Sequence, residues 1–238
     1  MSNLVALHNN AHQSLKVNTQ LAEAQGGNLH MIPVVLSEFL KLAVQFPIVF
    51  TKNKDTGRFS CITLFGFQAN ENLFVKNGEW NSLYIPLQIR RQPFFLGNSS
   101  EVENEFVICI DTDHKSLQSD IGEQVFDTTG KETPYLENIK SILAELMNGE
   151  ASTDNFVKTL AELNLLQPMR LEITFKNEES MRVDGLYTIN EDRLKTLEIE
   201  AITQLHQKNY LSAIYTMITS TGHIYGLIER KNKQLSGN

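Results

Sequence analysis

The chain has 238 residues, of which 41% are hydrophobic and 21% charged, and its net charge is −7. These proportions are ordinary for a folded globular protein and exclude wholesale disorder. The acidic balance leaves no overall basic footprint, so we expect no nucleic-acid partner.

The N-terminal residues 1–29 are polar and predict a loosely ordered arm. They lack the basic patch and apolar block of a signal peptide. No later segment approaches the about 18 consecutive apolar residues of a membrane-spanning helix. Cys61 and Cys109 lie in apolar, strand-like runs and are expected to be buried free thiols. We therefore expect a soluble, cytoplasmic protein.

The first half of the chain predicts one helix and several strands. The helix runs from Ser37 to Gln45, with an apolar side made of Phe39, Leu40, Ala43 and Val44. A hairpin follows, with strands at 48–51 and 58–67 around turn-forming residues 53–57. Asn77 and Gly78 mark a second turn, and residues 105–111 predict a further strand.

Helical spacing is more frequent in the second half. Thr133, followed by Pro134, predicts the start of a helix that ends at Asn148 and Gly149. A second helix is expected around residues 156–163. Residues 169–175 alternate as a strand, with Ile173 inward and Glu172 outward, and 181–189 form its partner. Asn190 predicts the cap of a further helix, and helical spacing continues through residues 211–218.

Together these elements predict an α+β fold. Hairpin-like strand pairs indicate a mainly antiparallel sheet with helices packed on it, and the helices are richer in the C-terminal half. We expect an N-terminal arm at residues 1–29, a single domain at 30–232 and a frayed, polar tail at 233–238.

The sequence contains no recognised catalytic motif. The serine-nucleophile elbow, the dinucleotide-binding glycine motif and the phosphate-binding P-loop are all absent. We therefore predict no cofactor. The most metal-like cluster is Asp111, Asp113 and His114, at the end of a predicted strand. The alternative is that these aspartates only satisfy the backbone of a turn.

An arginine pair lies in a run rich in aromatic residues and proline. Arg90 and Arg91 are flanked by Tyr84, Pro86 and Pro93. A guanidinium suits a carboxylate or phosphate, and adjacent side chains diverge. We expect one arginine to bind an anionic group and the other to brace the fold against an acid. The alternative is that one pairs with a structural acid and the other is solvated.

We assign four candidate ligand- or partner-binding residues in this region. The two arginines are joined by Tyr84 and by Trp80, the single tryptophan of the chain. Trp80 follows a turn and is also typical of a core residue.

The order of several short segments resembles the SapC family from about residue 30 onward. The segments are Pro47-Ile48-Val49-Phe50, Glu71-Asn72-Leu73-Phe74, Trp80 with Tyr84-Ile85-Pro86, Arg90-Arg91 with Pro93-Phe94, Ile110-Asp111, Val125-Phe126-Asp127 with Gly130, Asp184-Gly185-Leu186, and the stretch 210–220. The resemblance implies a bacterial protein, because the family was named from a bacterial surface-layer gene cluster. Some members carry a permease label, which the hydropathy of this chain contradicts.

The resemblance also implies possible partners. Family members tend to be encoded beside oxygenases, halogenase-like enzymes and outer-membrane receptors, but the family supplies no catalytic residues. We therefore expect an accessory or binding protein that acts with an oxygenase- or halogenase-type enzyme, or with a peptide or receptor segment. Two alternatives stay open: an enzyme with a metal site at Asp111, Asp113 and His114, and a small-molecule carrier with an aromatic pocket.

Overall fold

A computed structural model describes residues 3–98 and 106–237. The chain divides into two compact units, and three chain segments build each of them. The first unit comprises Met1–Gly27, Val75–Asn81 and Ile85–Met147, and the second comprises Asn28–Phe74, Ser82–Tyr84 and Asn148–Asn238. The predicted α+β fold is confirmed, because helices pack with sheets in which every strand pair is antiparallel.

The first unit contains small sheets and short helices. A three-stranded sheet has the order β1-β9-β8, and β2 pairs with β10 and β6 with β7. Its elements are β1 (Leu4–Ala6), β2 (Lys16–Val17), α1 (Thr19–Ala24), η1 (Gln25–Asn28), β6 (Val75–Lys76), β7 (Glu79–Trp80), α3 (Leu87–Arg90), β8 (Phe94–Asn98), β9 (Phe106–Asp111), η3 (Lys115–Leu117) and β10 (Glu123–Gln124).

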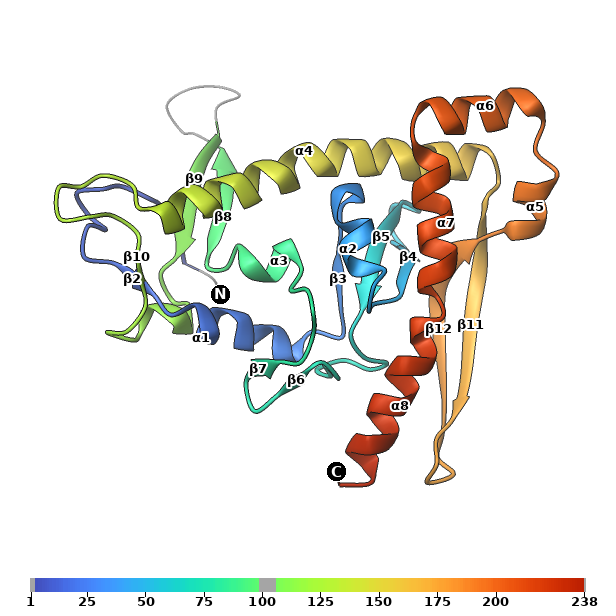
Figure 1. Cartoon of the computed structure of the whole chain (residues 1–238), viewed down its shortest axis with the longest axis horizontal. Coiled ribbons are helices and arrows are strands. Elements are labelled where there is room, and N and C mark those ends of the chain that lie inside the picture. The colour runs from blue at the N-terminus through green and yellow to red at the C-terminus, as the bar shows by residue number, and fades with distance from the viewer. Residues whose placement is uncertain (1–2, 99–105, 238) are drawn as a thin grey trace. The chain divides into compact units, whose positions relative to one another are not determined.

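The second unit is built on a five-stranded sheet in the order β11-β12-β4-β5-β3 (Figure 1). Its strands are β3 (Met31–Pro33), β4 (Ile48–Lys52), β5 (Phe59–Leu64), β11 (Leu166–Thr174) and β12 (Ser180–Ile189). Its helices are η2 (Leu36–Glu38), α2 (Phe39–Leu42), α5 (Glu191–Lys195), α6 (Ile199–Gln207), α7 (Tyr210–Ser220) and α8 (His223–Leu235).

Aromatic rings fill the core of the second unit. The Phe46 ring contacts Phe74 and Phe65 edge to face, with centroids 4.6 and 5.4 Å apart. Phe39 meets Phe156 in the same way at 6.1 Å. All five of these phenylalanine side chains are buried. Edge-to-face contact adds about 0.5–1.5 kcal/mol per pair to the burial of the rings.

One long helix, α4 (Pro134–Glu162), replaces the two helices expected from the sequence. Its start is as predicted, since Thr133 Oγ1 accepts a hydrogen bond from Leu136 N at 3.4 Å. The expected end at Gly149 was wrong. A Cβ atom there would lie 2.7 Å from the Cβ of Val35, so the glycine serves close packing and does not end the helix.

Residues 3–28, expected to form a loose arm, contain two strands and a helix. β1 pairs with β9, β2 pairs with β10, and Asn18 caps α1 by accepting a hydrogen bond from Leu21 N. The division into arm, single domain and tail stays a prediction. At the other end, α8 continues to Leu235, so the start of the expected tail is helical.

Three local expectations met different outcomes. The hairpin is confirmed as β4 and β5, and Gly57 takes the positive φ of its turn. The apolar side of the predicted helix 37–45 was wrong, because Leu40 and Val44 are exposed while Leu42 is buried. Both cysteines are free; Cys61 is buried as expected, and Cys109 is half-buried.

The alternation in β11 gives a test of the sheet. Ile173 is buried and Glu172 is exposed, as predicted. Ile173→Asp should abolish soluble expression, because it places an unpaired charge in the core. Glu172→Ala should change the free energy of unfolding by no more than about 0.5 kcal/mol. Solubility and thermal melting of both variants check this, and equal tolerance would contradict the strand phase.

Candidate functional site

Trp80 fixes a corner of the first unit where α1, β7 and α3 meet. Its indole Nε1 donates a hydrogen bond to the Glu23 carbonyl at 2.8 Å. The ring lies so close to Gly26 that a Cβ atom there would come within 2.7 Å of Trp80 Cζ2 and 3.2 Å of Ile89 Cδ1. Trp80 is therefore a packing residue that requires glycine at position 26.

Arg91 braces the segment between α3 and β8. Its Nε donates to Gln88 Oε1 at 2.7 Å, and its Nη1 donates to the Phe94 carbonyl at 2.8 Å. The guanidinium also stacks on the Phe95 ring at 4.2 Å. Burial lowers the pKa of Arg91 to about 10. The expected brace is present, but it is made to a carbonyl, an amide and a ring and not to an acid.

Arg90 stands in a different environment, although it is the neighbouring residue. Its side chain is half-buried at the end of α3. Burial raises the pKa of the Glu23 carboxyl, and the charge of Arg90 opposes this by lowering it. Within residues 3–98 and 106–237, however, the guanidinium forms no hydrogen bond or direct ion pair. Its donors thus stay available to an anion.

Tyr84 belongs to the second unit and is engaged there. Its hydroxyl donates to Oε1 of the fully buried Glu38 at 2.9 Å. Lys41 Nζ lies 5.7 Å from the centre of the Tyr84 ring. Tyr84 therefore satisfies a buried carboxylate, and this structural role accounts for its position.

The predicted metal cluster forms a turn. Asp111 Oδ1 accepts hydrogen bonds from Asn3 N at 3.0 Å and from Asp113 N at 3.2 Å. The buried His114 caps η3, with its Nδ1 2.8 Å from Ser116 Oγ, and burial lowers the pKa of its imidazole. No three His, Cys, Asp or Glu side chains in the described part of the chain are grouped to hold a metal ion. The metal assignment therefore gains no support.

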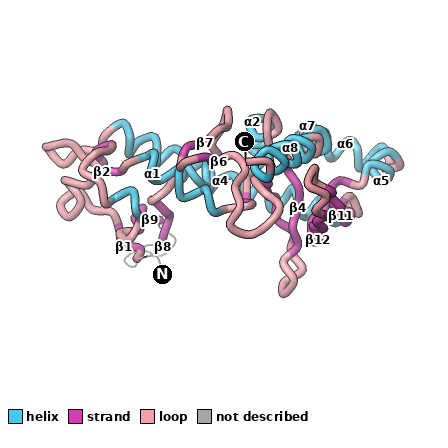
Figure 2. The backbone as a smooth tube through the Cα atoms, turned by 90° about the horizontal axis from the view of Figure 1, so that it is seen from below, coloured by secondary structure: helices cyan, strands magenta, loops and turns pink. Residues whose placement is uncertain are grey.

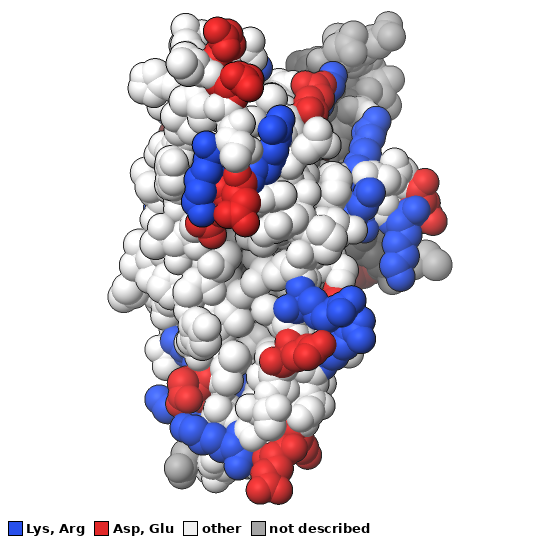
Figure 3. All heavy atoms as spheres, turned by 90° about the vertical axis from the view of Figure 1, so that its right-hand side faces the viewer, with Lys and Arg blue, Asp and Glu red and all other residues white. Residues whose placement is uncertain are grey.

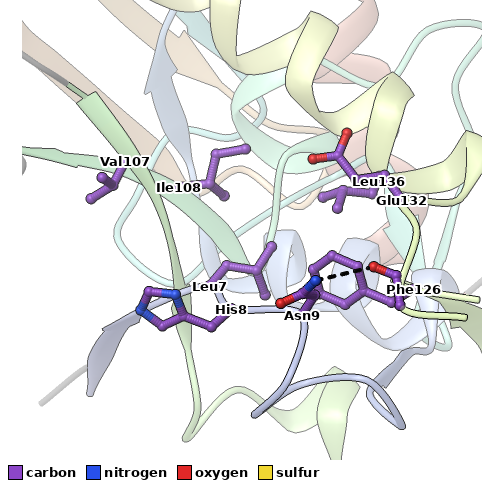
Figure 4. Close-up of a pocket in the computed structure, with 9 residues that line it drawn as sticks. Leu7, His8, Asn9, Val107, Ile108, Phe126, Glu132 and Leu136 are labelled. Atoms are coloured by element: carbon purple, nitrogen blue, oxygen red, sulfur yellow. Dashed lines mark hydrogen bonds between the residues drawn. The ribbon is translucent and has the colours of Figure 1, made fainter.

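A pocket of about 360 Å³ lies in the first unit between β9 and the start of α4 (Figure 4). Leu7, Val107, Ile108, Phe126 and Leu136 supply its apolar lining. Two of its polar side chains are engaged: Asn9 Nδ2 donates to the Gly130 carbonyl at 3.4 Å, and Glu132 accepts from Lys140 Nζ at 2.7 Å.

The polar groups of this pocket do not converge. In Figure 4 the His8 ring and the Glu132 carboxylate lie at opposite ends of the labelled set. The volume suits a small molecule, but such sites also bring a few polar groups together. The carrier hypothesis therefore rests on volume alone.

None of the helices in the described residues is both long and apolar enough to cross a membrane. The family model of SapC matches residues 7–227. The chain belongs to the SapC family. No curated protein and no solved structure matches it.

Several segments that carry the SapC resemblance have structural roles. In Glu71-Asn72-Leu73-Phe74, Glu71 forms a buried ion pair with Lys231, and Asn72 Oδ1 accepts a hydrogen bond from Phe74 N at 2.9 Å. Sequence reasoning missed this pair. The sequence gives only two signals for it. They are a glutamate in an apolar segment and a lysine four residues after Leu227 on a helix.

Other SapC segments form turns. Asp127 Oδ1 accepts from Thr129 N at 2.7 Å and from Lys131 N at 3.0 Å, and these hydrogen bonds lower its pKa. Gly130, in the same turn, has a φ of 80°. The family segments thus largely specify the fold, and Arg90 is the candidate residue whose side chain has no such role.

Arg91→Gln tests the brace. The variant should lose about 1–3 kcal/mol of unfolding free energy, because the Phe94 carbonyl loses its donor and Phe95 its stacked cation. Arg90→Gln is the matched control and should melt like wild type. Urea titration of both variants measures this difference. Equal stability of the two would contradict the assigned roles.

Proposed function

We propose that this SapC-family protein is a non-enzymatic binding protein whose Arg90 receives an anionic group from a protein or peptide partner. One observation carries the proposal. Arg90 is a half-buried guanidinium without a hydrogen-bonded acceptor among the described residues, whereas Arg91, Tyr84, Asp111 and His114 all use their polar atoms inside the fold.

The chemistry favours a carboxylate or phosphate on the partner. A partly desolvated guanidinium binds such groups through paired, charge-assisted hydrogen bonds. Glu23 lies near enough to be affected by the Arg90 charge, and burial raises its pKa. An incoming anion would therefore meet the Arg90 cation beside a carboxyl whose pKa is raised by burial.

The partner classes come from the family resemblance. We propose that the protein acts in the bacterial cytoplasm with an oxygenase- or halogenase-type enzyme, or with a peptide or receptor segment. The surface drawn in Figure 3 supports a protein partner over nucleic acid, because its Lys and Arg side chains are mixed with Asp and Glu and form no continuous basic stripe.

Affinity purification from native lysate tests the proposal. Wild-type protein should retain a stoichiometric partner that Arg90→Gln loses by about tenfold or more, since a buried anion contact is typically worth about 2–5 kcal/mol. Arg90→Lys should recover part of the binding, because it keeps the charge but not the paired donors.

The control is Lys131→Gln, which removes an exposed cation elsewhere in the first unit. It should retain the partner in full. Capture of the same proteins by wild type and Arg90→Gln, in equal amounts, would overturn the role of Arg90.

A further inference from the structure

Three helices of the second unit form a layer beside its sheet. Figure 2 shows α2, α7 and α8 together on one side, with β4, β11 and β12 on the other. One polar contact joins this layer to β4, and another joins two segments within the layer. Ser220 Oγ accepts from Ile48 N at 2.9 Å, and the His223 Nε2 atom lies 2.8 Å from the Ala43 carbonyl oxygen.

The outer side of this layer exposes apolar and aromatic side chains. Leu40 and Val44 are 71% and 59% exposed, and Tyr215 and Tyr225 are 58% and 76% exposed. Leu83 is 83% exposed and is tied to the end of α2 by a hydrogen bond from its N to Gln45 Oε1 at 2.7 Å. We call these five residues the uncharged helix surface.

The stretch of chain that carries Tyr215 and Tyr225 has no charged side chain. Residues 209–228 contain no Asp, Glu, Lys or Arg, although charged residues make up 21% of the chain. Exposed helix faces are normally covered with charged side chains. Exposed tyrosines with depleted charge are typical of the centre of a protein–protein interface. The uncharged helix surface therefore has the composition of a docking site.

Glu229, four residues after Tyr225 on α8, is paired with Lys176 Nζ at 3.1 Å, and the charges beside the surface that are unpaired among the described residues include two cations. Lys41 is exposed and directly follows Leu40, and Lys208 precedes α7 with its Nζ 5.8 Å from the Tyr210 ring. Beside Tyr210 lies a pocket of about 550 Å³ whose lining includes Lys158 and Lys208, against the single acid Glu162. In a chain of net charge −7, this cationic border favours an acidic occupant.

We propose that the uncharged helix surface docks an acidic amphipathic helix of a partner protein. Apolar side chains of that helix would cover Tyr215, Tyr225 and Val44, while its carboxylates face Lys41 and Lys208. This inference rests on the proposed binding function and adds a second contact surface to it. It makes the partner a helix-in-groove type of ligand with a defined charge.

A synthetic peptide provides the probe. We would use an amphipathic helix of about 18 residues, long enough to be helical, with leucines on one side and glutamates beside them. The matched peptide has lysine in place of every glutamate. Fluorescence anisotropy with the full chain should show that the acidic peptide binds at least about tenfold more tightly than the basic one.

Variants locate the binding. Tyr225→Lys and Val44→Lys should each weaken the acidic peptide by about tenfold or more, because both place a charge in the contact. Lys208→Glu should weaken the acidic peptide and strengthen the basic one. Ile199→Lys is the control, since Ile199 is 79% exposed on α6, outside the uncharged helix surface. It should bind as wild type does, and all four variants should melt normally.

Four outcomes would overturn the inference. They are equal binding of the two peptides, equal loss in Ile199→Lys, self-association that Tyr225→Lys abolishes, and adsorption to phosphatidylserine vesicles that Tyr225→Lys abolishes. The third would make a second copy of the chain the occupant, and the fourth a membrane.

Arg90→Gln separates this inference from the proposed function. It should bind the peptide as wild type does, because Arg90 belongs to the other unit. If the peptide fails to bind while a partner still depends on Arg90, only the uncharged helix surface is refuted. If the peptide binds and no partner depends on Arg90, only the role of Arg90 is refuted.

Discussion

Lys231 and Glu71 form an ion pair inside the second unit, and the position of α8 depends on it. Lys231 Nζ lies 2.5 Å from Glu71 Oε1, and Glu71 Oε2 accepts from Phe67 N at 2.9 Å. The residues on either side of Lys231 extend this contact: Arg230 stacks on the Phe74 ring at 4.2 Å, and Asn232 Oδ1 accepts from Lys176 N at 2.9 Å. Loss of one partner of such a pair leaves a buried charge and typically costs about 3–5 kcal/mol.

The contacts of Arg230, Lys231 and Asn232 make the inner side of the helix layer different from its outer side. Polar side chains of α7 and α8 that could bind a partner are used inward, on the sheet and the loop after β5. From Asn209 to Ile228 what remains outside is uncharged and partly aromatic, and the exposed charges of α8 begin at Glu229. The first unit shows the same difference between two neighbouring residues. Arg91 donates its hydrogen bonds within the fold, whereas the guanidinium of Arg90 donates none among the described residues. In both units, the groups proposed to bind a partner are those that make no hydrogen bond or ion pair within the fold among the described residues.

Local patterns made much of the fold predictable. The β4–β5 hairpin, the turn at Asn77 and Gly78, and the Asn190 cap each follow from a few neighbouring residues, and the structure contains all three. The alternation around Ile173 likewise gave the correct inward face. These features depend on turn chemistry and strand period, which a single sequence displays directly.

Contacts between distant residues were not predictable. Gly149 is typical of a helix end, but here it makes room for Val35. Leu40 and Val44 are apolar and so are expected in the core, yet both are exposed. The sequence does not show that Lys231 pairs with Glu71, which lies 160 residues earlier. For the site, the sequence predicted that Arg90 and Arg91 would have different roles. It did not show which of them would hydrogen-bond within the fold. That choice depends on Phe94 and Phe95 folding back beside Arg91.

Hydrogen–deuterium exchange of the full chain, alone and in its purified partner complex, tests the central claim most directly. The account predicts slower exchange in α3 and along α7 and α8 in the complex, with little change at Leu7–Asn9 or Val107–Ile108, which line the pocket of Figure 4. Protection confined to that pocket, with α3, α7 and α8 exchanging as in the free protein, would contradict it.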